Sequence, residues 1–272
     1  MPFTKMHGLG NDFIFINGLT SRLPNPKVTA RELCDRRYGI GADQILILTK
    51  SRRADFRMQI FNADGGEVGM CGNGLRALAR FVAEKKLSSK KELVIETGNG
   101  LQKVKVVGKN RILVDMGEPI LKGKLIPVNL SGRAINRPVR VEGKEFRITC
   151  VSMGNPHAVI FMEDISSFRV EKYGPLLERH TLFPQRANIE FVKVLNREAM
   201  EMRVWERGAG ETLACGSGAC ASAVAGVLNG FIDRKVTVHL KGGKLEIEWD
   251  RTTNHVKMIG PAETVFEGEV EI

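Results

Sequence analysis

The chain has 272 residues, of which 41 are Lys or Arg and 31 are Asp or Glu, so its formal net charge is +10 at pH 7. This length favours two domains, each able to bury its own core, over a single domain. The basic residues are scattered and no aromatic residues alternate with them, which argues against a nucleic-acid interface. No apolar run approaches the ~20 residues of a membrane span, and the first residues lack an apolar signal core, so the expected location is the cytoplasm.

In chain order, strand patterns flank one long helix, and the whole series occurs twice. In the first half we predict strands at 13–16, 44–48 and 56–61, a helix at 71–86, and strands at 92–97, 101–107 and 111–116. In the second half we predict strands at 157–162, 189–195 and 200–205, a helix at 215–229, and strands at 235–240, 244–249 and 255–260. The predicted fold is therefore two α+β domains, each a mostly antiparallel sheet or half-barrel around one central helix. The Pro- and Gly-containing stretch 117–133 is the expected crossing between them.

Both predicted helices open with the tetrad Cys-Gly-polar-Gly, as "MCGNG" from Met70 and "ACGSG" from Ala214. The cysteines of the two tetrads, Cys71 and Cys215, lie 144 positions apart. The same offset pairs three other polar positions: Asn11 with Asn155, Gln44 with Asn188, and Asn62 with Glu206. A fixed offset shared by polar positions and by the apolar patterns between them indicates an internal duplication.

The five cysteines are odd in number and include no C-x-x-C pair, which argues against a disulfide framework and against a metal site. In a reducing compartment most such cysteines are small core residues. We predict that role for Cys34, Cys150 and Cys220. The two tetrad cysteines need a separate explanation.

A glycine-rich helix start presents backbone N–H groups and the positive end of the helix dipole, and can therefore hold a carboxylate. The same field is expected to lower the pKa of a cysteine placed there. Two such helices, one from each domain, could bring one thiol to each face of an anionic ligand in a cleft between the domains. A stereocentre between two acid/base groups can lose its proton to one side and regain it from the other, which is racemisation or epimerisation. This scheme requires no cofactor.

Three other interpretations stay open at this point. The segments 72–77 and 216–221 both fit G-x-G-x-x-A, and Glu96 follows the first as in a dinucleotide site, although no parallel βαβ alternation surrounds them. A disulfide between Cys71 and Cys215 is disfavoured by the compartment. A non-enzymatic binding module could use the two helix starts only to clasp a ligand.

The segments "KMHGLGNDF", "MCGNG", "SMGNPH" and "ERGAGETLACGSGA" resemble, in order and over the whole chain, those of the diaminopimelate epimerase family. The resemblance implies a cofactor-independent isomerase that interconverts LL- and meso-diaminopimelate in lysine and peptidoglycan precursor biosynthesis. It implies that Cys71 and Cys215 act as base on one face of the substrate and acid on the other. The related proline racemases usually have a histidine in the first tetrad, where this chain has Asn73.

The resemblance also assigns further residues. Those implied to hold the substrate are Asn11, Gln44, Asn62, Asn155, Asn188 and Arg207. Those implied to receive the reacting carboxylate are Gly72, Asn73, Gly216 and Ser217. His157 and Glu206 are implied to contact the reacting amino group or to tune the thiols, while His7 stays undecided.

Two features of the assembly follow from the resemblance as well. The family is commonly homodimeric, often with a tyrosine where this chain has Phe266. The final strand is expected to return to the first domain, which gives domains of 1–117 with 262–272, and 118–261.

Overall fold

The structure, a computed structural model, describes residues 1–272 and contains two compact units. The first unit comprises residues 1–115 and 259–272, and the second comprises 116–258. The chain therefore crosses into the second unit after Asp115, slightly before the expected crossing. The stretch 117–133 belongs to the second unit, and its residues Ile126 and Val128 are buried in the core of that unit. None of the helices has the length and apolar character that a membrane crossing requires.

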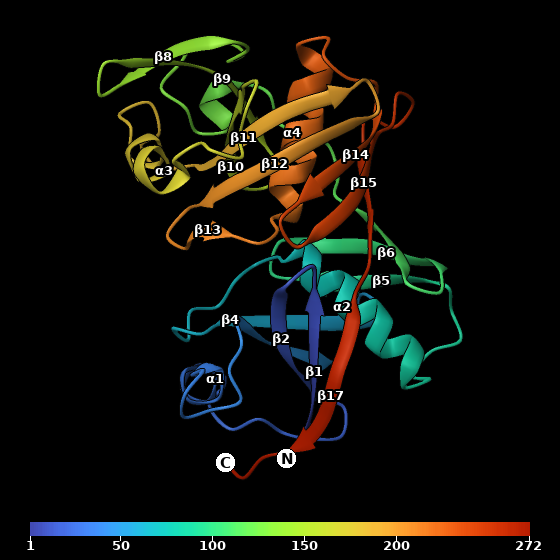
Figure 1. Ribbon diagram of the computed structural model, residues 1–272. Helices are drawn as coiled ribbons and strands as arrows, with labels where there is room; N and C mark the ends of the chain where they lie inside the picture. Colours follow the sequence, from blue (N-terminus) through green and yellow to red (C-terminus); the bar gives the residue numbers. More distant parts are fainter. The chain divides into compact units, whose positions relative to one another are not determined.

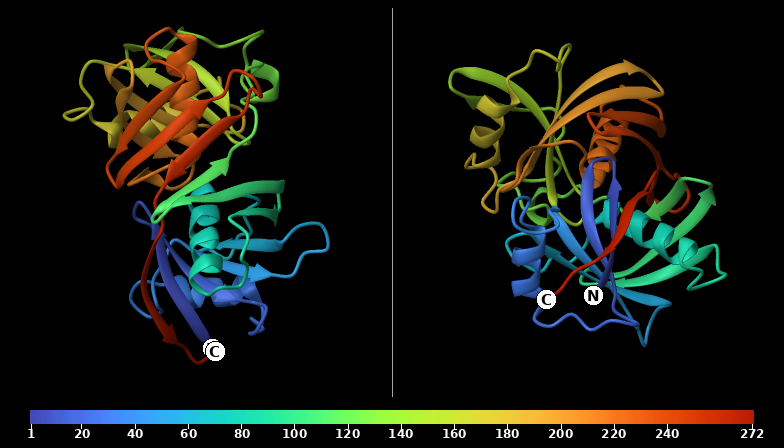
Figure 2. Two further views of the ribbon diagram at one scale, coloured as in Figure 1. Left: turned by 90° about the vertical axis from the view of Figure 1, so that its right-hand side faces the viewer. Right: turned by 60° about the horizontal axis from the view of Figure 1, so that its bottom comes forward.

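The first unit is a mixed sheet in the order β17–β1–β2–β3–β4–β5–β6–β7, in which only the β2–β3 and β4–β5 pairs are parallel. Its strands are β1 (Pro2–Gly8), β2 (Asn11–Asn17), β3 (Gln44–Thr49), β4 (Phe56–Asn62), β5 (Glu92–Thr97), β6 (Gly100–Gly108), β7 (Arg111–Asp115) and β17 (Glu263–Glu269). Its helices are α1 (Pro26–Cys34) and α2 (Gly72–Glu84) (Figure 1). The two termini lie side by side in every view (Figure 2), and the Met1 amino group donates to the Val270 carbonyl over 2.6 Å.

The second unit pairs its strands in the order β8–β9–β10–β11–β12–β14–β15, with β10–β11 and β12–β14 parallel. Its strands are β8 (Arg137–Val141), β9 (Lys144–Ser152), β10 (Pro156–Phe161), β11 (Asn188–Asn196), β12 (Ala199–Glu206), β13 (Gly210–Thr212), β14 (Lys235–Leu240) and β15 (Gly243–Trp249). The strand β16 (Val256–Gly260) includes the last residues of this unit and the first residues of the returning chain. The helices of the second unit are the 3₁₀ turn η1 (Gly123–Leu125), α3 (Val170–Glu178) and α4 (Gly216–Leu228). The predicted α+β class and the mostly antiparallel sheets are confirmed.

The two units repeat the same strand register. Phe13 lies opposite Gln44 in the first unit, and His157 lies opposite Asn188 in the second, which is the predicted offset of 144. Beyond the central helices the offset falls to 143, because Leu93 opposite Val104 corresponds to Val236 opposite Ile247. The duplication is therefore present in the fold as well as in the sequence. After the central helix, the second copy is one residue shorter than the first.

The central helices fill the concave side of their sheets in two different ways. α2 packs against β1, β6, β7 and β17, burying Leu78 and stacking Phe81 on Phe15 with ring centroids 4.3 Å apart. α4 packs against β9, β10, β11, β14 and β15 and is apolar on all sides, as expected of a helix enclosed by its surroundings. Its small residues, such as Ala219 and Ala223, let the strands approach closely. Figure 1 shows each helix lying against the strands of its own unit.

The short helices α1 and α3 were not predicted, although they occupy equivalent positions in the duplication, since 26–34 and 170–178 differ by the same 144. Each has only nine residues, and α3 contains Pro175. An amphipathic pattern of barely two turns gives too little periodic signal to detect.

Candidate active site

Cys71 and Cys215 are the N-cap residues of α2 and α4 and have extended backbone conformations. The sulfur of Cys71 accepts a hydrogen bond from the Gly74 amide over 3.3 Å, and the sulfur of Cys215 accepts one from the Gly218 amide over 3.4 Å. Both thiols therefore point back over the first turn, where backbone N–H groups lack helical acceptors. A thiolate in this position is stabilised by the helix field.

This geometry explains why each tetrad ends in glycine. A Cβ at Gly218 would stand 2.8 Å from Glu190 Oε1 and 3.3 Å from Cys215 Sγ. A Cβ at Gly74 would stand 3.1 Å from a methyl carbon of Leu46. A side chain at position 218 would thus collide with Glu190, and one at position 74 would require Leu46 to shift.

The sequence-based expectation of a lowered thiol pKa is wrong for Cys215. Burial raises the pKa of this thiol well above its ordinary value, and the nearby carboxylates of Glu206 and Glu190 raise it further. Hydrogen bonds from Ser217 and the Gly218 amide oppose the rise without cancelling it. The prediction considered the helix terminus alone and omitted the desolvation and the two carboxylates.

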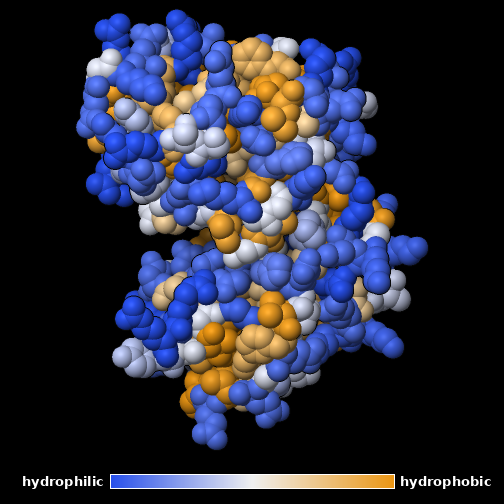
Figure 3. Space-filling view, viewed as in Figure 1, coloured by the Kyte–Doolittle hydropathy of each residue, from blue (hydrophilic) through white to orange (hydrophobic).

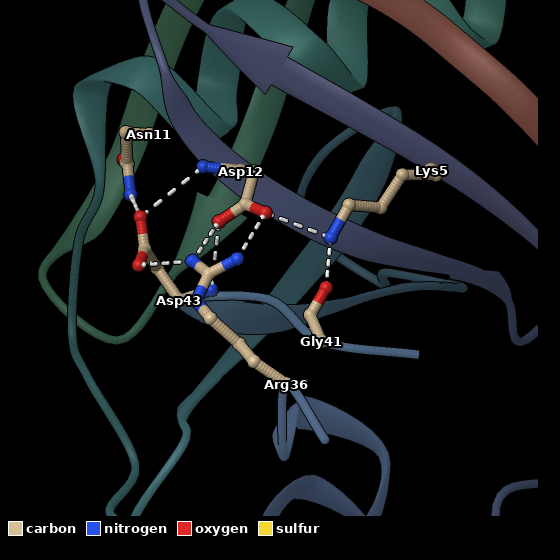
Figure 4. A network of polar contacts seen from close by, with 6 residues as sticks. All are labelled: Lys5, Asn11, Asp12, Arg36, Gly41 and Asp43. Atoms are coloured by element: carbon tan, nitrogen blue, oxygen red, sulfur yellow. Dashed lines mark hydrogen bonds and ion pairs between the residues drawn. The ribbon is translucent and has the colours of Figure 1, made fainter. Parts of the chain in front are cut away.

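In the first unit, the amide of Asn11 lies beside Cys71. Its Oδ1 accepts from Asn73 Nδ2 over 3.2 Å and lies 3.8 Å from Cys71 Sγ. Its Nδ2 donates to Asp43 Oδ2 over 2.8 Å (Figure 4). Because an ionised carboxylate only accepts hydrogen bonds, Asp43 holds the Asn11 amide with its oxygen toward the thiol.

Asp43 belongs to a wider charged network on β1, β2 and the loop before β3 (Figure 4). Arg36 bridges Asp12 and Asp43 at 2.7 and 2.9 Å, and Lys5 lies 2.8 Å from Asp12 and donates to the Gly41 carbonyl. Partial burial would raise the pKa of Asp12, but Arg36 and Lys5 outweigh it and lower that pKa to about 2. The network anchors the strand ends from which Asn11 projects.

Two more predicted residues of the first unit lie together. Gln44 Nε2 donates to Asn62 Oδ1 over 2.8 Å, and Gln44 Oε1 is buried with no partner. Asn73 is held from behind by Arg76, which is itself fully buried and donates to the Pro261 carbonyl. The undecided His7 lies 3.8 Å from Glu263, and its Nδ1 is buried without a partner.

In the second unit, three residues link the buried carboxylate of Glu190 to Cys215. Glu190 Oε1 lies 2.7 Å from His157 Nδ1, and His157 Nε2 lies 2.9 Å from Asn155 Oδ1. Asn155 Nδ2 donates to Ser217 Oγ over 3.3 Å, and Ser217 Oγ lies 3.6 Å from Cys215 Sγ. The side chains of His157 and Glu190 are both fully buried.

The other predicted residues of the second unit are positioned by strand ends. Asn188 Nδ2 donates to the Pro156 carbonyl, and its Oδ1 accepts from the Arg207 amide over 2.9 Å. Thr212 donates to Glu206 over 2.5 Å. Burial raises the pKa of Glu206 despite hydrogen bonds from Thr212 and Cys215. A carboxyl group with a raised pKa beside a thiol is typical of sites that move protons.

Sequence reasoning missed Glu190, Thr212 and Asp43. Glu190 stands at the position equivalent to Leu46, so a comparison of the two halves for positions where they differ would have found it. Asp43 adjoins Gln44 and could have been found only by asking what holds the predicted substrate residues.

The dinucleotide interpretation has little support in the structure. β4 ends at Asn62, and the irregular stretch 63–71 separates it from α2, whereas a dinucleotide site needs a tight strand-to-helix turn. Glu96 accepts a hydrogen bond from Ser51 over 2.5 Å. The last glycine of each tetrad is accounted for by the crowding beside the thiol.

Comparison with known proteins gives a family. A family model described as diaminopimelate epimerase matches residues 3–122 and 149–265. Among curated relatives described as diaminopimelate epimerase, that of Acetivibrio thermocellus is 52% identical over 100% of this chain and 99% of its own. That of Moorella thermoacetica is 51% identical over 99% of both chains, and that of Methanococcus maripaludis is 48% identical over 100% of both.

Solved structures share the fold at much lower identity. A PhzF-family phenazine biosynthesis protein from Bacillus anthracis superposes with a TM-score of 0.74 at 17% identity, covering 100% of this chain and 99% of its own. A hydroxyproline epimerase from Agrobacterium vitis gives a TM-score of 0.73 at 15% identity, covering 98% of this chain and 91% of its own. These likenesses support the fold, and the model match with the close relatives supports the family. The chain belongs to the diaminopimelate epimerase family.

Proposed function

We propose that this chain interconverts LL- and meso-diaminopimelate, with Cys71 and Cys215 as the two acid/base groups on opposite faces of one α-carbon. The observation that carries the two-thiol assignment is the duplicated cap, in which each sulfur folds back over the N-terminus of its central helix. The family assignment and the names of the close relatives point to the substrate.

The reaction needs one group that removes the α-proton and one that returns a proton. A thiolate at one face takes the proton as the C–H bond breaks, and the S–H at the other face delivers a proton to the carbanion. At the end the first sulfur is a thiol and the second a thiolate, so the next turnover can run in the reverse direction or follow proton exchange with solvent. No electrons are gained or lost.

The negative charge that develops on the substrate must be held without an electron-withdrawing cofactor. The first turns of α2 and α4 offer the amides of Gly72, Asn73, Gly216 and Ser217. Backbone donors fixed in advance at a helix N-terminus stabilise a carboxylate as charge builds on it. We assign the reacting carboxylate to these groups.

In the protein without substrate, we assign the protonated role to Cys215, because burial and two carboxylates raise the pKa of its thiol. Cys215 then acts first as the acid, and Cys71 as the base. His157 and Glu206 lie near Cys215 and are assigned to the reacting amino group or to adjustment of the thiol.

The remaining polar residues are assigned to the rest of the substrate: Asn11, Gln44, Asn62, Asn155, Asn188 and Arg207. The unpartnered Gln44 Oε1 is an acceptor suited to an ammonium group. Arg207 is exposed at the end of β12 and presents a guanidinium suited to a carboxylate. A diamino diacid has one of each group at its non-reacting end.

The deciding experiment supplies the purified protein with LL-diaminopimelate and no added cofactor. We expect meso-diaminopimelate to form, with solvent deuterium entering the α-position. Saturable binding without isomerisation or exchange would leave the binding-module interpretation. Activity strictly dependent on added nicotinamide would revive the dinucleotide interpretation.

A further inference from the structure

Glu190 is a buried carboxylate on β11 that the proposed mechanism does not use. Its side chain is 0% exposed, and its Oε2 has no hydrogen-bond partner. Burying a carboxylate with one oxygen unsatisfied destabilises a protein relative to an apolar residue of similar size. Packing alone therefore does not explain its presence.

The contacts of Glu190 lead to the second thiol. Its Oε1 lies 2.7 Å from His157 Nδ1, and this contact fixes the imidazole ring so that Nε2 donates to the amide oxygen of Asn155, which can only accept. The other ring nitrogen is thereby directed at Asn155, whose amide nitrogen donates to Ser217 beside Cys215. Each member of the chain fixes the orientation of the next.

The first unit provides an internal comparison. The positions equivalent to His157 and Glu190 hold Phe13 and Leu46, both fully buried. Leu46 lies beside Gly74 as Glu190 lies beside Gly218. The fold therefore accommodates an apolar pair at these two positions in the first unit. The polar pair of His157 and Glu190 occurs only in the unit that contains Cys215.

We propose that Glu190 is a positioning residue for Cys215: it fixes the ring of His157, and His157 and Asn155 then hold the Ser217 hydroxyl against the thiol. The proposal rests on the proposed function in that Cys215 is taken as one of the two acid/base groups. Glu190 itself lies beneath the thiol and acts through His157. The duplicated halves would thus differ in a built-in way, with one thiol supported by a polar chain and the other above apolar residues.

The charges around the thiol agree with this assignment. The titratable groups that face Glu190 and Cys215 are His157 on β10, Glu206 on β12 and Cys150 on β9. Burial is the main cause of the raised pKa of the Cys215 and Cys150 thiols, and the carboxylate of Glu190 raises both further. Removing the charge of Glu190 should therefore change the pKa of the Cys215 thiol. Cys71 in the other unit serves as the reference within the same molecule.

The first test is Glu190→Gln, which keeps the shape and removes the charge. Steady-state kinetics and the pH dependence of alkylation at Cys215 and Cys71, resolved by peptide mass mapping, are measured together. We expect kcat to fall about tenfold with KM changed less than about twofold, because a misplaced thiol slows proton transfer more than it weakens substrate binding. The alkylation midpoint of Cys215 should shift to lower pH, and that of Cys71 should not move.

A matched control is Glu178→Gln. Glu178 is also a buried carboxylate of the second unit, but it accepts from Trp205 and Gly208 and is not connected to the thiol. This variant should lower stability without moving the Cys215 midpoint. Equal shifts in the two Glu→Gln variants would show a general effect of lost buried charge and would overturn the proposal.

The second test installs the apolar pair of the first unit by the double change His157→Phe and Glu190→Leu. Replacing a buried ion pair with apolar residues of similar volume is often neutral or stabilising, so this variant should fold even if Glu190→Gln does not. We expect near-normal resistance to urea together with a loss of kcat and a shifted Cys215 midpoint. A wild-type Cys215 midpoint or wild-type kcat in the folded variants would overturn the proposal.

The alkylation measurement uses no substrate, so its outcome is independent of the epimerase assignment. Failure of the proposed function would appear as isomerisation that survives Cys215→Ala. Failure of the present proposal would appear as an alkylation midpoint of Cys215 that is the same in Glu190→Gln as in the wild type.

Discussion

Asn11 Nδ2 donates to Asp43 Oδ2 over 2.8 Å (Figure 4), and this bond turns the amide oxygen of Asn11 toward Cys71. The equivalent Asn155 is held by the ring of His157 instead. Both halves thus keep an asparagine beside the thiol, and each half orients it with a different group. The first half uses the carboxylate of Asp43 for this purpose, and the second half uses the imidazole of His157.

Asp43→Ala should lower kcat/KM without unfolding the protein. A hydrogen bond to a charged group contributes about 1.5–3 kcal/mol, which corresponds to a loss of about tenfold or more once Asn11 can turn over. Asp55→Ala is the control, since Asp55 is a carboxylate of the same unit that pairs with Lys90 at 2.6 Å, away from Asn11. The measurement is the steady-state kinetics of both variants. Equal kcat/KM values for Asp43→Ala and Asp55→Ala would contradict the role assigned to Asp43.

Cys71→Ala and Cys215→Ala should each abolish epimerisation in both directions with the fold intact, because each direction uses both sulfurs. Serine at either position should be nearly as poor, since a hydroxyl is far less acidic than a thiol. Product formation by chiral chromatography and circular dichroism of the variants are the measurements. An alanine variant that kept more than about one hundredth of the wild-type rate would exclude the two-thiol scheme.

The other three cysteines provide the controls for that experiment. Cys34, Cys150 and Cys220 are buried, as predicted, with exposures of 2%, 2% and 0%. Replacing each with alanine removes only a small buried group and should cost about 1 kcal/mol of stability. Urea unfolding should show this loss of stability, whereas the epimerisation rate should stay at the wild-type value.

The duplication made most of the fold predictable. Each strand pattern was supported by its copy 144 residues away, and the central helices begin at Gly72 and Gly216, directly after the tetrad cysteines. The same comparison also related the polar positions of the two halves, which the structure places at equivalent strand ends. Two weak signals at a fixed offset are stronger than either one alone.

The parts that could not be predicted depend on tertiary contacts. Glu190 reads as an ordinary polar residue of a half-buried strand until His157, from a neighbouring strand, is placed against it. The pKa of Cys215 is raised by desolvation and by Glu206, which belongs to another strand. The local sequence predicts the helix terminus, but it does not predict which side chains of the neighbouring strands lie beside that terminus.

Asp12 should make the stability of the protein depend on acidity. Its pKa is lowered to about 2 in the folded state, below the ~3.9 of an unfolded aspartate, so the folded state binds fewer protons. The contribution, about 2 kcal/mol, is complete above pH ~4 and is lost as the pH falls toward 2. Urea unfolding of wild type and Asp12→Asn should differ at pH 7 and converge near pH 2. A difference that stays constant with pH would contradict the assignment.

Phe266 should contribute to a homodimer. β17 exposes Val265 and Phe266, which are 55% and 47% accessible, and Figure 3 shows apolar side chains gathered over the strands of the first unit. The ring of Phe266 meets that of Phe3 edge-on at 5.8 Å, so it is held in place on the surface. Phe266→Asp should shift sedimentation from dimer to monomer. Monomeric wild-type protein, or an unaffected dimer in the variant, would contradict this prediction.

Gly218→Ala should damage catalysis more than Gly74→Ala, although the two glycines are equivalent in the duplication. The new methyl group at position 218 would lie 2.8 Å from Glu190 Oε1 and 3.3 Å from Cys215 Sγ, and Glu190 cannot retreat because it is fully buried against His157. At position 74 the methyl group meets a terminal carbon of Leu46 at 3.1 Å, which a small side-chain rotation relieves. Overpacking of a rigid site costs about 1–3 kcal/mol, so Gly218→Ala should lose stability on that scale and most of its kcat, whereas Gly74→Ala should lose less of both. Urea unfolding and steady-state kinetics on the pair test this order, and the reverse order would mean that Glu190 is free to move and does not hold the second thiol in place.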